Sequence, residues 1–543
     1  MRMNEAPDNV RLIGGEMLLW SDLSSVGGVT DWRGAALELL RRLLPEGGRV
    51  LLVGPHAQGL VDEVVARAGT VAVLLRSYPD ACALGERHPG LEVFCGRLEV
   101  LDADEPYDLV LALDGLLRTH SAEAPAAAWN ESLEALADLV APGGRMVLGV
   151  HNDLGVDRFI EARPAGRECA DDQWAPHGFD PGYPGGPAAL DLGLESAGLS
   201  VQRCYSAYPD RQSPRSLLSR EALGFELPEA LTFALSAGEG DRMLVADPLR
   251  LSRQVFRHGL GEALAPLWLA VASRPPRAAD TALAVALPLG LIEEGQALYE
   301  LTAGGTRRLP GGEERPIPAG RVVEEILVEA CAREDVRTVR ELLSALAAWL
   351  ESDGRTDPAA WSAATDSLVY DGRRFAAVNP PASPATSPDP RVALCRILWR
   401  FAVRLVAAGH HHPWPWPLEA DELTLTLCGM AERPCDPGDL DRARKLDAEL
   451  GRPAEVAEHA PTYRDLLGAR DRLADQLTAA LARIARLETK LSYRERELVR
   501  AKAKLRRTQR KATAYRRTLG YRLSRRLARP RRVARRVIRL LSG

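Results

Sequence analysis

The stretch Arg49–Gly59, RVLLVGPHAQG, decides the fold of the first half of this 543-residue chain. Its apolar run, RVLLV, predicts a buried strand, because short apolar runs bounded by turn residues are typical of strands covered on both faces. The run ends at Gly54 and a helical pattern, LVDEVVARAG, follows. A strand, a glycine turn and a helix in this order form the ligand-binding corner of parallel α/β domains, where a ligand reaches the free N–H groups of the helix N-terminus.

Further apolar runs follow the first at regular intervals. They predict strands at Thr70–Leu75, Leu91–Cys95, Tyr107–Leu113, Pro142–Val150, Leu199–Tyr205 and Leu264–Ser273. A helical pattern from about Ala126 to Val140 separates the fourth and fifth strands. Strands that alternate with helices in this way predict a largely parallel sheet covered by helices on both faces.

Three of these segments carry a resemblance to a known family. The ordered set of YDLVLALDGLL, the helix near 126–140 and APGGRMVLGV resembles class I S-adenosylmethionine-dependent methyltransferases. VHNDLGV at 150–156 and AYPDRQSP at 207–214 resemble a bacterial multidomain subgroup that is similar to cell-surface polysaccharide enzymes. The resemblance implies a Rossmann-like, seven-stranded methyltransferase domain over residues 1–275.

The resemblance also implies a site for S-adenosylmethionine after the first three strands. The residues expected there are Gly54, His56, Gln58, Gly59, Leu75, Arg76 and Arg97. The turn residues would hold the methionine end of the cofactor, the pair after the second strand would flank the ribose, and the arginine after the third strand would flank the adenine.

This site departs from the family pattern at three acidic positions. Leu52, Leu75 and Arg97 stand where the family carries acids. Each lost charge-assisted hydrogen bond would weaken binding by about 1.5–3 kcal/mol, so we expect cofactor binding to be weak or lost. Nearby acids that could replace them are Asp62, Asp80, Asp102 and Asp104.

The acceptor side of the site would lie after the fourth and fifth strands. Asp114 and His120 follow the fourth strand, and His151 and Asn152 follow the fifth. In an active enzyme, His120 or His151 would serve as the general base, because imidazole titrates near neutral pH. The alternative is that both histidines are ordinary polar residues at strand ends.

Composition narrows the setting of the protein. No apolar run is long enough to span a membrane, and the N-terminus has no apolar signal core, so we expect a cytoplasmic protein. The eight cysteines form no C-x-x-C pair. We therefore expect buried thiols in a reducing compartment and no metal site.

The rest of the chain divides by composition into several segments. Residues 276–378 predict a degenerate mixed α+β module that ends in a hairpin around Asp371-Gly372, and residues 379–390 a proline-rich linker. Residues 391–460 predict a helical region, residues 461–510 a coiled coil and residues 511–543 a basic amphipathic tail.

The coiled coil is predicted from a heptad repeat. Apolar residues occupy position a at Leu477, Ile484, Leu491, Leu498 and Leu505, and position d includes Leu466, Leu473, Ala480 and Leu487. Sustained a/d spacing predicts self-association, although Arg494 at position d weakens the seam. The alternative is a single long helix lying on the body of the protein.

The tail carries the charge asymmetry of the chain. Residues 501–543 contain 17 Lys and Arg and no acid, whereas the first 500 residues carry a net charge of −21. Arginine clusters combined with aliphatic residues at helical spacing predict a helix at an anionic membrane surface, which would place the protein at the inner face of the membrane. A nucleic-acid arm is disfavoured, since stacking aromatics are scarce.

Together these patterns predict a methyltransferase-like protein in cell-surface glycan or related biosynthesis, with weak or lost cofactor binding. One alternative is a non-catalytic, membrane-associated scaffold for a glycosyltransferase or another pathway partner. The other is a protein that binds a nucleotide or nucleotide-sugar, with Arg76 and Arg97 on phosphate instead of adenosine.

Overall fold

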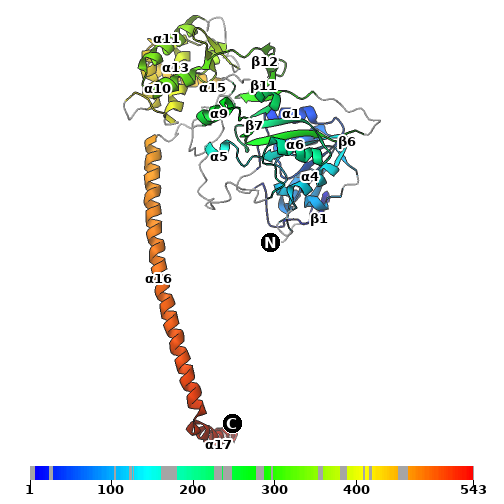
Figure 1. The fold of residues 1–543 in the computed structure, drawn as a ribbon, viewed down its shortest axis with the longest axis vertical. Coiled ribbons are helices and arrows are strands. Elements are labelled where there is room, and N and C mark those ends of the chain that lie inside the picture. Colours follow the sequence, from blue (N-terminus) through cyan, green and yellow to red (C-terminus); the bar gives the residue numbers. More distant parts are fainter. Residues whose placement is uncertain are drawn as a thin grey trace. The chain divides into compact units, whose positions relative to one another are not determined.

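The computed structural model describes residues 6–23, 29–102, 105–121, 125, 127–160, 180–224, 231, 235, 248–276, 286–294, 297–352, 359–378, 388–407, 410–414, 419–450 and 463–541. The chain divides into two compact units, residues 1–460 and residues 461–543. The first unit holds a large sheet and a separate helical core, and the second consists of two helices (Figure 1).

The large sheet is mixed and has thirteen strands. Its order is β1-β4-β3-β2-β5-β6-β9-β7-β8-β10-β11-β12-β13. The strands are β1 (Val10–Gly14), β2 (Arg49–Val53), β3 (Thr70–Leu75), β4 (Glu92–Gly96), β5 (Tyr107–Ala112), β6 (Val140–His151), β7 (Ser200–Tyr208), β8 (Ser216–Ser219), β9 (Leu267–Ser273), β10 (Gly290–Glu294), β11 (Ala297–Thr302), β12 (Gly305–Leu309) and β13 (Glu314–Arg315).

The centre of this sheet has the strand order of a Rossmann-like domain. Strands β4, β3, β2, β5 and β6 are mutually parallel, and in chain order they run third, second, first, fourth and fifth. Strand β9 inserts antiparallel between β6 and β7. The prediction of a Rossmann-like sheet is confirmed, but the predicted number of seven strands is wrong. The sheet continues beyond residue 275 because β8 and β10 to β13 add antiparallel strands to the β7 edge.

Alternating residues of the central strands bury opposite faces of the sheet. In β2, Leu51 and Val53 belong to one core cluster and Val50 and Leu52 to another. One face is covered by α1 (Ala35–Leu43), α2 (Gln58–Arg67) and α3 (Tyr78–Arg87), and the other by α4 (Trp129–Asp138), α6 (Pro187–Ser196) and α9 (Pro248–Arg257). Shorter helices are η1 (Leu98–Val100), η2 (Leu117–Thr119), α5 (Asp157–Ile160) and α7 (Arg220–Gly224). Burial on both faces explains the continuous apolar runs in the sequence.

A second core lies in the helical part of the first unit. It is formed by α10 (Val323–Ala332), α11 (Val336–Ser352), α12 (Ala359–Ser362), α13 (Pro390–Ala407), α14 (Ala420–Met430) and α15 (Pro437–Glu449). A small sheet of β14 (Arg321–Val322), β15 (Leu368–Tyr370) and β16 (Phe375–Ala377) lies beside them. The predicted hairpin at Asp371-Gly372 is confirmed, with Gly372 at φ +96°. Most of the predicted linker, residues 379–387, lies outside the described residues.

A buried ion-pair triad joins α13 to α15 in this core. Asp447 accepts hydrogen bonds from Nε of Arg396 at 2.8 Å and from Nη1 of Arg400 at 2.9 Å. The Arg396 side chain is fully buried, and those of Arg400 and Asp447 are nearly so. Asp447 is the carboxylate partner of two guanidinium groups that are buried away from water. Its loss would be costly, because a buried charge without a partner is strongly destabilising.

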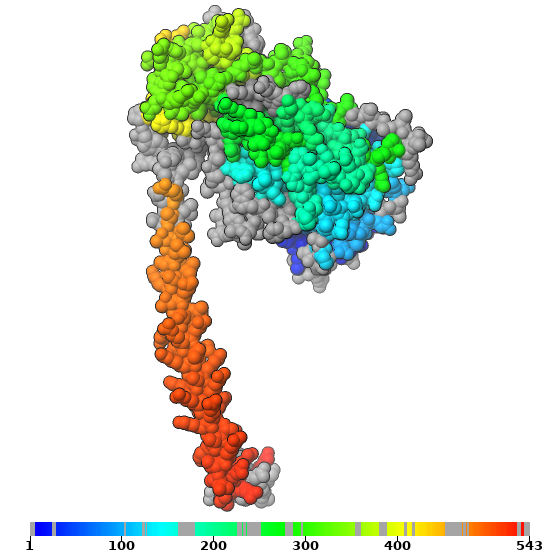
Figure 2. Space-filling model, in the orientation of Figure 1, coloured from blue at the N-terminus to red at the C-terminus, as the bar shows by residue number. Residues whose placement is uncertain are grey.

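The second unit begins with α16 (Tyr463–Arg517), a single helix of 55 residues, followed by α17 (Leu519–Leu541). The leucine and isoleucine side chains of the predicted seam are more than half exposed wherever they are described, including Ile484 at 51% and Leu491 at 60%. Figure 2 shows α16 in orange and red as an elongated rod. None of the described helices is both long and apolar enough to cross a membrane.

We expect Asp447→Asn to lower the free energy of unfolding of the helical core by about 3–5 kcal/mol, because two buried guanidinium groups lose their carboxylate. Chemical denaturation followed by circular dichroism would measure the change. Asp441→Asn on the same helix is the control, since the Asp441 side chain is 72% exposed and pairs with Arg444 only at 3.8 Å. Equal stability of the two variants would contradict the prediction.

Candidate functional site

The candidate site lies where the parallel strands β2, β3, β4, β5 and β6 end at one edge of the sheet, since ligands of open α/β sheets bind outside the carboxyl ends of the strands. After β2, Gly54 has φ +88°, a conformation that favours glycine, and it turns the chain toward α2. Gln58 and Gly59 form the first turn of that helix. The predicted strand, glycine turn and helix are therefore present.

The His56 side chain fills the turn after β2. Its Nδ1 lies 2.9 Å from the carbonyl oxygen of Gly54, and the side chain is buried. Burial lowers the pKa of His56, and the nearby Asp114 carboxylate offsets part of this effect. A neutral ring that donates from Nδ1 leaves Nε2 as an acceptor, and within the described part of the chain Nε2 has no hydrogen-bond partner.

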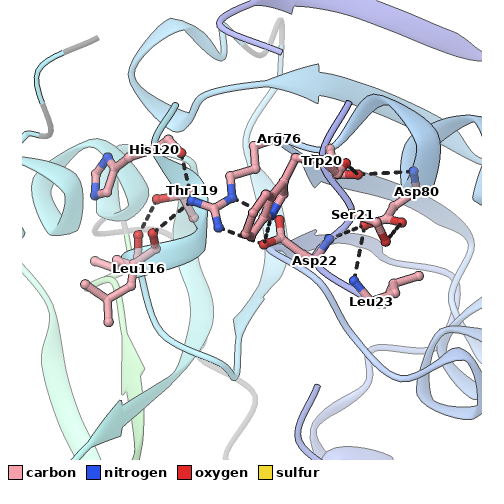
Figure 3. A network of polar contacts seen from close by, with 11 residues as sticks. Trp20, Ser21, Asp22, Leu23, Arg76, Asp80, Leu116, Thr119 and His120 are labelled. Carbon is pink, nitrogen blue, oxygen red and sulfur yellow. Dashed lines mark hydrogen bonds and ion pairs between the residues drawn. The ribbon is translucent and has the colours of Figure 1, made fainter. Parts of the chain in front are cut away.

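The side chain after β3 is engaged by the N-terminal segment, which we define as residues 15–23 and 29–33. Arg76 donates from Nε and Nη2 to the two carboxylate oxygens of Asp22, at 2.9 Å and 2.7 Å (Figure 3). Its Nη1 also donates to the carbonyl oxygen of His120 at 3.0 Å. Trp20 Nε1 donates to Asp22 as well, at 3.0 Å. The Arg76 guanidinium group therefore links the N-terminal segment to the residues that follow β3 and β5.

The carboxylate of Asp80 in the first turn of α3 holds the same segment. It accepts hydrogen bonds from the Ser21 hydroxyl at 2.6 Å and from the backbone N–H groups of Asp22 and Leu23 at 2.8 Å and 3.3 Å (Figure 3). The hydroxyl of Ser77 donates to the carbonyl oxygen of Trp20 at 2.7 Å. Asp80, one of the acids that could have replaced a lost cofactor ligand, is thus satisfied by the chain itself.

The carboxylate of Asp114, after β5, anchors the second part of the segment. It accepts from Trp32 Nε1 at 3.0 Å and from the backbone N–H of Thr30 at 3.2 Å. On the other side, Asp31 accepts from Arg215 at 2.9 Å, and its backbone N–H donates to the carbonyl oxygen of Gln212 at 2.7 Å. The N-terminal segment is therefore bonded to the ends of β3 and β5 and also to the stretch that follows β7.

The residues at the positions of the missing acids pack against other parts of the chain. Leu52 and Leu75 are buried members of the core beneath the sheet. The aliphatic part of Arg97 lies against Gly15, where an added Cβ would approach it to 3.1 Å. Of the other candidate acids, Asp62 pairs with Arg87 and His88 on the surface, and Asp104 lies outside the described residues.

The predicted acceptor-side residues are only partly brought together. Asp114 and His151 line one small pocket together with Trp129 and Tyr183, and the Tyr183 hydroxyl donates to the backbone carbonyl of His151 at 2.7 Å. His120 faces elsewhere, because its Nδ1 lies 2.6 Å from Glu99.

Asn152 is a structural residue. Its Nδ2 donates to the carbonyl oxygens of Ala263 and Ala265 at 2.8 Å and 2.9 Å, and its Oδ1 accepts from the backbone N–H of Leu154 at 2.9 Å. These three bonds fix the turn after β6 against the start of β9. Its prediction as an acceptor-side residue is therefore not supported by its surroundings.

These residues do not fit S-adenosylmethionine. The turn at Gly54 and the unpartnered Nε2 of His56 could meet the methionine end, but Leu75 and Arg97 offer no acceptor for ribose hydroxyls or the adenine amino group. Arg76, between them, already binds Asp22. The site therefore has the outline of a cofactor corner without an acid at the three positions where the resemblance expects one.

Comparison with known proteins adds little. No protein-family model matches the chain, and no curated protein matches it. Similar solved structures include the CcbJ methyltransferase of Streptomyces caelestis (16% identity, 47% of this chain, 94% of that chain, TM-score 0.26) and the [4+2]-cyclase SpnF (18%, 47%, 86%, 0.25). A TehB-like SAM-dependent methyltransferase of Corynebacterium glutamicum is another (14%, 44%, 86%, 0.24). TM-scores this low carry no argument, and the fold rests on the strand order described above.

The sequence predicts an entry loop near the cofactor site at Trp20–Trp32, but the contacts of this stretch with the strand ends were missed. Asp22 binds Arg76, which lies 54 positions later in the chain, and Trp32 binds Asp114, which lies 82 positions later. A signal was available in part, because the sequence carries two aspartates and two tryptophans between residues 20 and 32, ahead of the first helix. Nothing local indicates which strand ends they contact.

The Arg76–Asp22 pair should control the local opening of the N-terminal segment. We expect Asp22→Asn to speed hydrogen exchange of the peptide containing Asp22 and Leu23 by about 10- to 100-fold at pH 7, since a hydrogen bond between charged groups contributes about 1.5–3 kcal/mol. The control is Asp62→Asn, because Asp62 forms an exposed pair with Arg87 that should be worth at most about 1 kcal/mol.

This difference should depend on pH. Burial raises the pKa of Asp22, but hydrogen bonds from Arg76 and Trp20 outweigh it and hold the pKa below its ordinary value. The stabilisation is therefore complete above the ordinary aspartate pKa of about 3.9 and is lost as the pH falls through the lower pKa of the folded state. An exchange difference between wild type and Asp22→Asn that stayed constant down to pH 2 would contradict this assignment.

Proposed function

We propose that this chain is a methyltransferase-like protein that has lost ordinary S-adenosylmethionine binding and works as a non-catalytic scaffold. One observation carries the proposal. The polar side chains at the carboxyl ends of the central strands, Arg76, Asp80 and Asp114, bind the protein's own N-terminal segment instead of facing an open cleft.

The energetics support this reading. A ligand that enters the cofactor corner must displace a bidentate ion pair whose Asp22 side chain is only 4% exposed. It would gain no charged acceptor in return from Leu52, Leu75 or Arg97. Each absent charge-assisted bond is worth about 1.5–3 kcal/mol, and about 1.4 kcal/mol is a tenfold change in affinity. Losses of this size favour a self-closed site over a ligand-binding one.

The nucleotide alternative is less favoured. It needs Arg76 and Arg97 to bind phosphate, but the guanidinium of Arg76 already holds both oxygens of Asp22. A phosphate would have to compete with a covalently linked carboxylate that is always present. The scaffold alternative needs no such exchange.

The pathway is proposed from the resemblance alone. The stretches at 150–156 and 207–214 are similar to those of a subgroup of cell-surface polysaccharide enzymes. We therefore propose a role in cell-surface glycan biosynthesis, with a glycosyltransferase or another enzyme of that pathway as the partner. Purification of the partner by proximity labelling in the native host tests this part, and recovery of no glycan enzyme would overturn it.

The lost-cofactor proposal predicts the result of a titration. Isothermal calorimetry of the full chain with S-adenosylmethionine and S-adenosylhomocysteine should give no binding up to millimolar ligand, because the acids are missing. Asp22→Ala, which frees the segment, should not restore binding. Micromolar binding by wild type would overturn the proposal. Micromolar binding by Asp22→Ala alone would instead mean that the segment is a lid over a working site.

We also propose that α16 pairs with α16 of a second copy of this chain. Its a and d positions form an apolar stripe that is exposed in the single chain. Light scattering should give twice the 59.1 kDa chain mass. Ile484→Lys in the stripe should lower it toward that of one chain, while Ala482→Lys, on the outer face of the same helix turn, should not. A wild-type chain that is monomeric at tens of micromolar would contradict the pairing.

We propose further that α17 binds an anionic membrane surface. It is rich in arginine and has no acidic residue, and Leu523 and Leu527 are 60% and 66% exposed. Each basic residue near an anionic surface is worth about 1 kcal/mol, so the full chain should float with phosphatidylglycerol vesicles and stay unbound with neutral ones. A chain ending at Lys511 should bind much less. Equal flotation of both chains would remove the proposal.

A further inference from the structure

Three cysteines that are far apart in the sequence meet in the helical core. Cys395 lies in α13, Cys428 in α14, and Cys435 immediately before the N-cap residue of α15. Their three Sγ atoms lie within 4.8 Å of one another. Of the His, Cys, Asp and Glu side chains that the structure describes, only these three form a group able to hold a metal ion. Spacings of 33 and 7 residues gave no sign of this cluster in the sequence.

We propose that Cys395, Cys428 and Cys435 form a three-thiolate site for a thiophilic metal ion such as Zn²⁺. Zinc–sulfur bonds of about 2.3 Å place ligand sulfurs roughly 3.8 Å apart, so the observed separations need only a small closure. Thiolates select zinc and copper(I) over harder ions. No site of this kind follows from the methyltransferase resemblance, whose motifs all lie before residue 276.

The surroundings of the three sulfurs suit ligation better than ordinary packing. Cys395 and Cys428 are fully buried, whereas Cys435 is half-buried and offers a route from solvent. The Cys435 Sγ also lies 3.5 Å from the carbonyl oxygen of Arg433 and 3.8 Å from that of Arg391. The three sulfurs therefore converge at a place that an ion from solvent can reach.

Zinc binding would deprotonate the three thiols. The ion would replace the three S–H protons, so one Zn²⁺ enters, three protons leave, and a Zn(S–Cys)₃ group of charge −1 forms. The Arg391 guanidinium lies beside the cluster, where Nη2 donates to Pro434 O at 2.9 Å and to Asp439 at 3.0 Å. Its positive charge is paired with the Asp439 carboxylate. Three protein ligands leave the fourth zinc position for water, as in zinc sites that exchange ligands.

Such an ion would link three helices at one point. Helix α13 packs on both α14 and α15, and the cluster lies where the last residues of α14 meet the segment leading to α15. Bound metal would stabilise this packing by the free energy of binding, since the unfolded chain has no preformed site. The site lies in the helical core and does not depend on the proposed function of the sheet domain.

The test uses the full chain, stripped of metal with a chelator and a thiol reductant, loaded with Zn²⁺ and desalted. We expect one zinc per chain by emission spectrometry, and protection of three thiols from alkylation by mass spectrometry. Co²⁺ in place of zinc should give the intense near-ultraviolet absorption of cobalt–thiolate bonds. Cys435→Ser and Cys428→Ser should weaken retention at least tenfold.

Cys331→Ser is the matched control, because Cys331 is a buried thiol of α10 in the same core but lies outside the cluster. It should retain zinc as the wild type does. Cys435→Ser removes only a half-buried thiol, so it keeps the test decisive if the Cys428 variant does not fold. No zinc in the wild type, or equal zinc in the Cys435 variant, would overturn the proposal. The proposal would also be overturned if two of the three cysteines formed a disulfide in the metal-free, unreduced chain and added zinc did not prevent it.

Discussion

The arrangement of the sheet edge depends on the pairing of Arg76 with Asp22. A parallel sheet brings all its strand ends to one edge, and the polar residues there need partners because the strands around them are buried. In this chain those partners come from residues 15–23 and 29–33, which satisfy Arg76, Asp80 and Asp114. The edge that could have been a ligand site is thereby part of the folded chain.

The fold of the central sheet could be predicted because its determinants are local. Strands β2 and β3 have the predicted bounds, Arg49–Val53 and Thr70–Leu75, since burial on both faces requires continuous apolar runs. The additional strands β10 to β13 could not be assigned to the same sheet. Their alternating pattern indicates a strand but not its neighbour, and their pairing depends on β8 offering a free edge.

The candidate site could be predicted only in outline. Residues such as Gly54 and Arg76 follow directly from strand ends, and the structure places them there. Their chemistry depends on contacts across more than 50 positions, as between Arg76 and Asp22, and no periodicity encodes such a contact. The cysteine cluster was missed for a similar reason, because the packing of α13 on α14, rather than spacing along the chain, brings Cys395 to Cys428.

The length of α16 has a consequence for any partner of the last helix. A helix of 55 residues rises about 80 Å along its axis, more than the width of a typical domain. Whatever α17 binds is therefore held at a distance from the start of α16 that the length of the helix sets. Binding at one end of a stiff spacer raises the effective concentration of the other end only at targets within the length of the spacer. The length of α16 therefore limits which two targets its ends can bind at the same time.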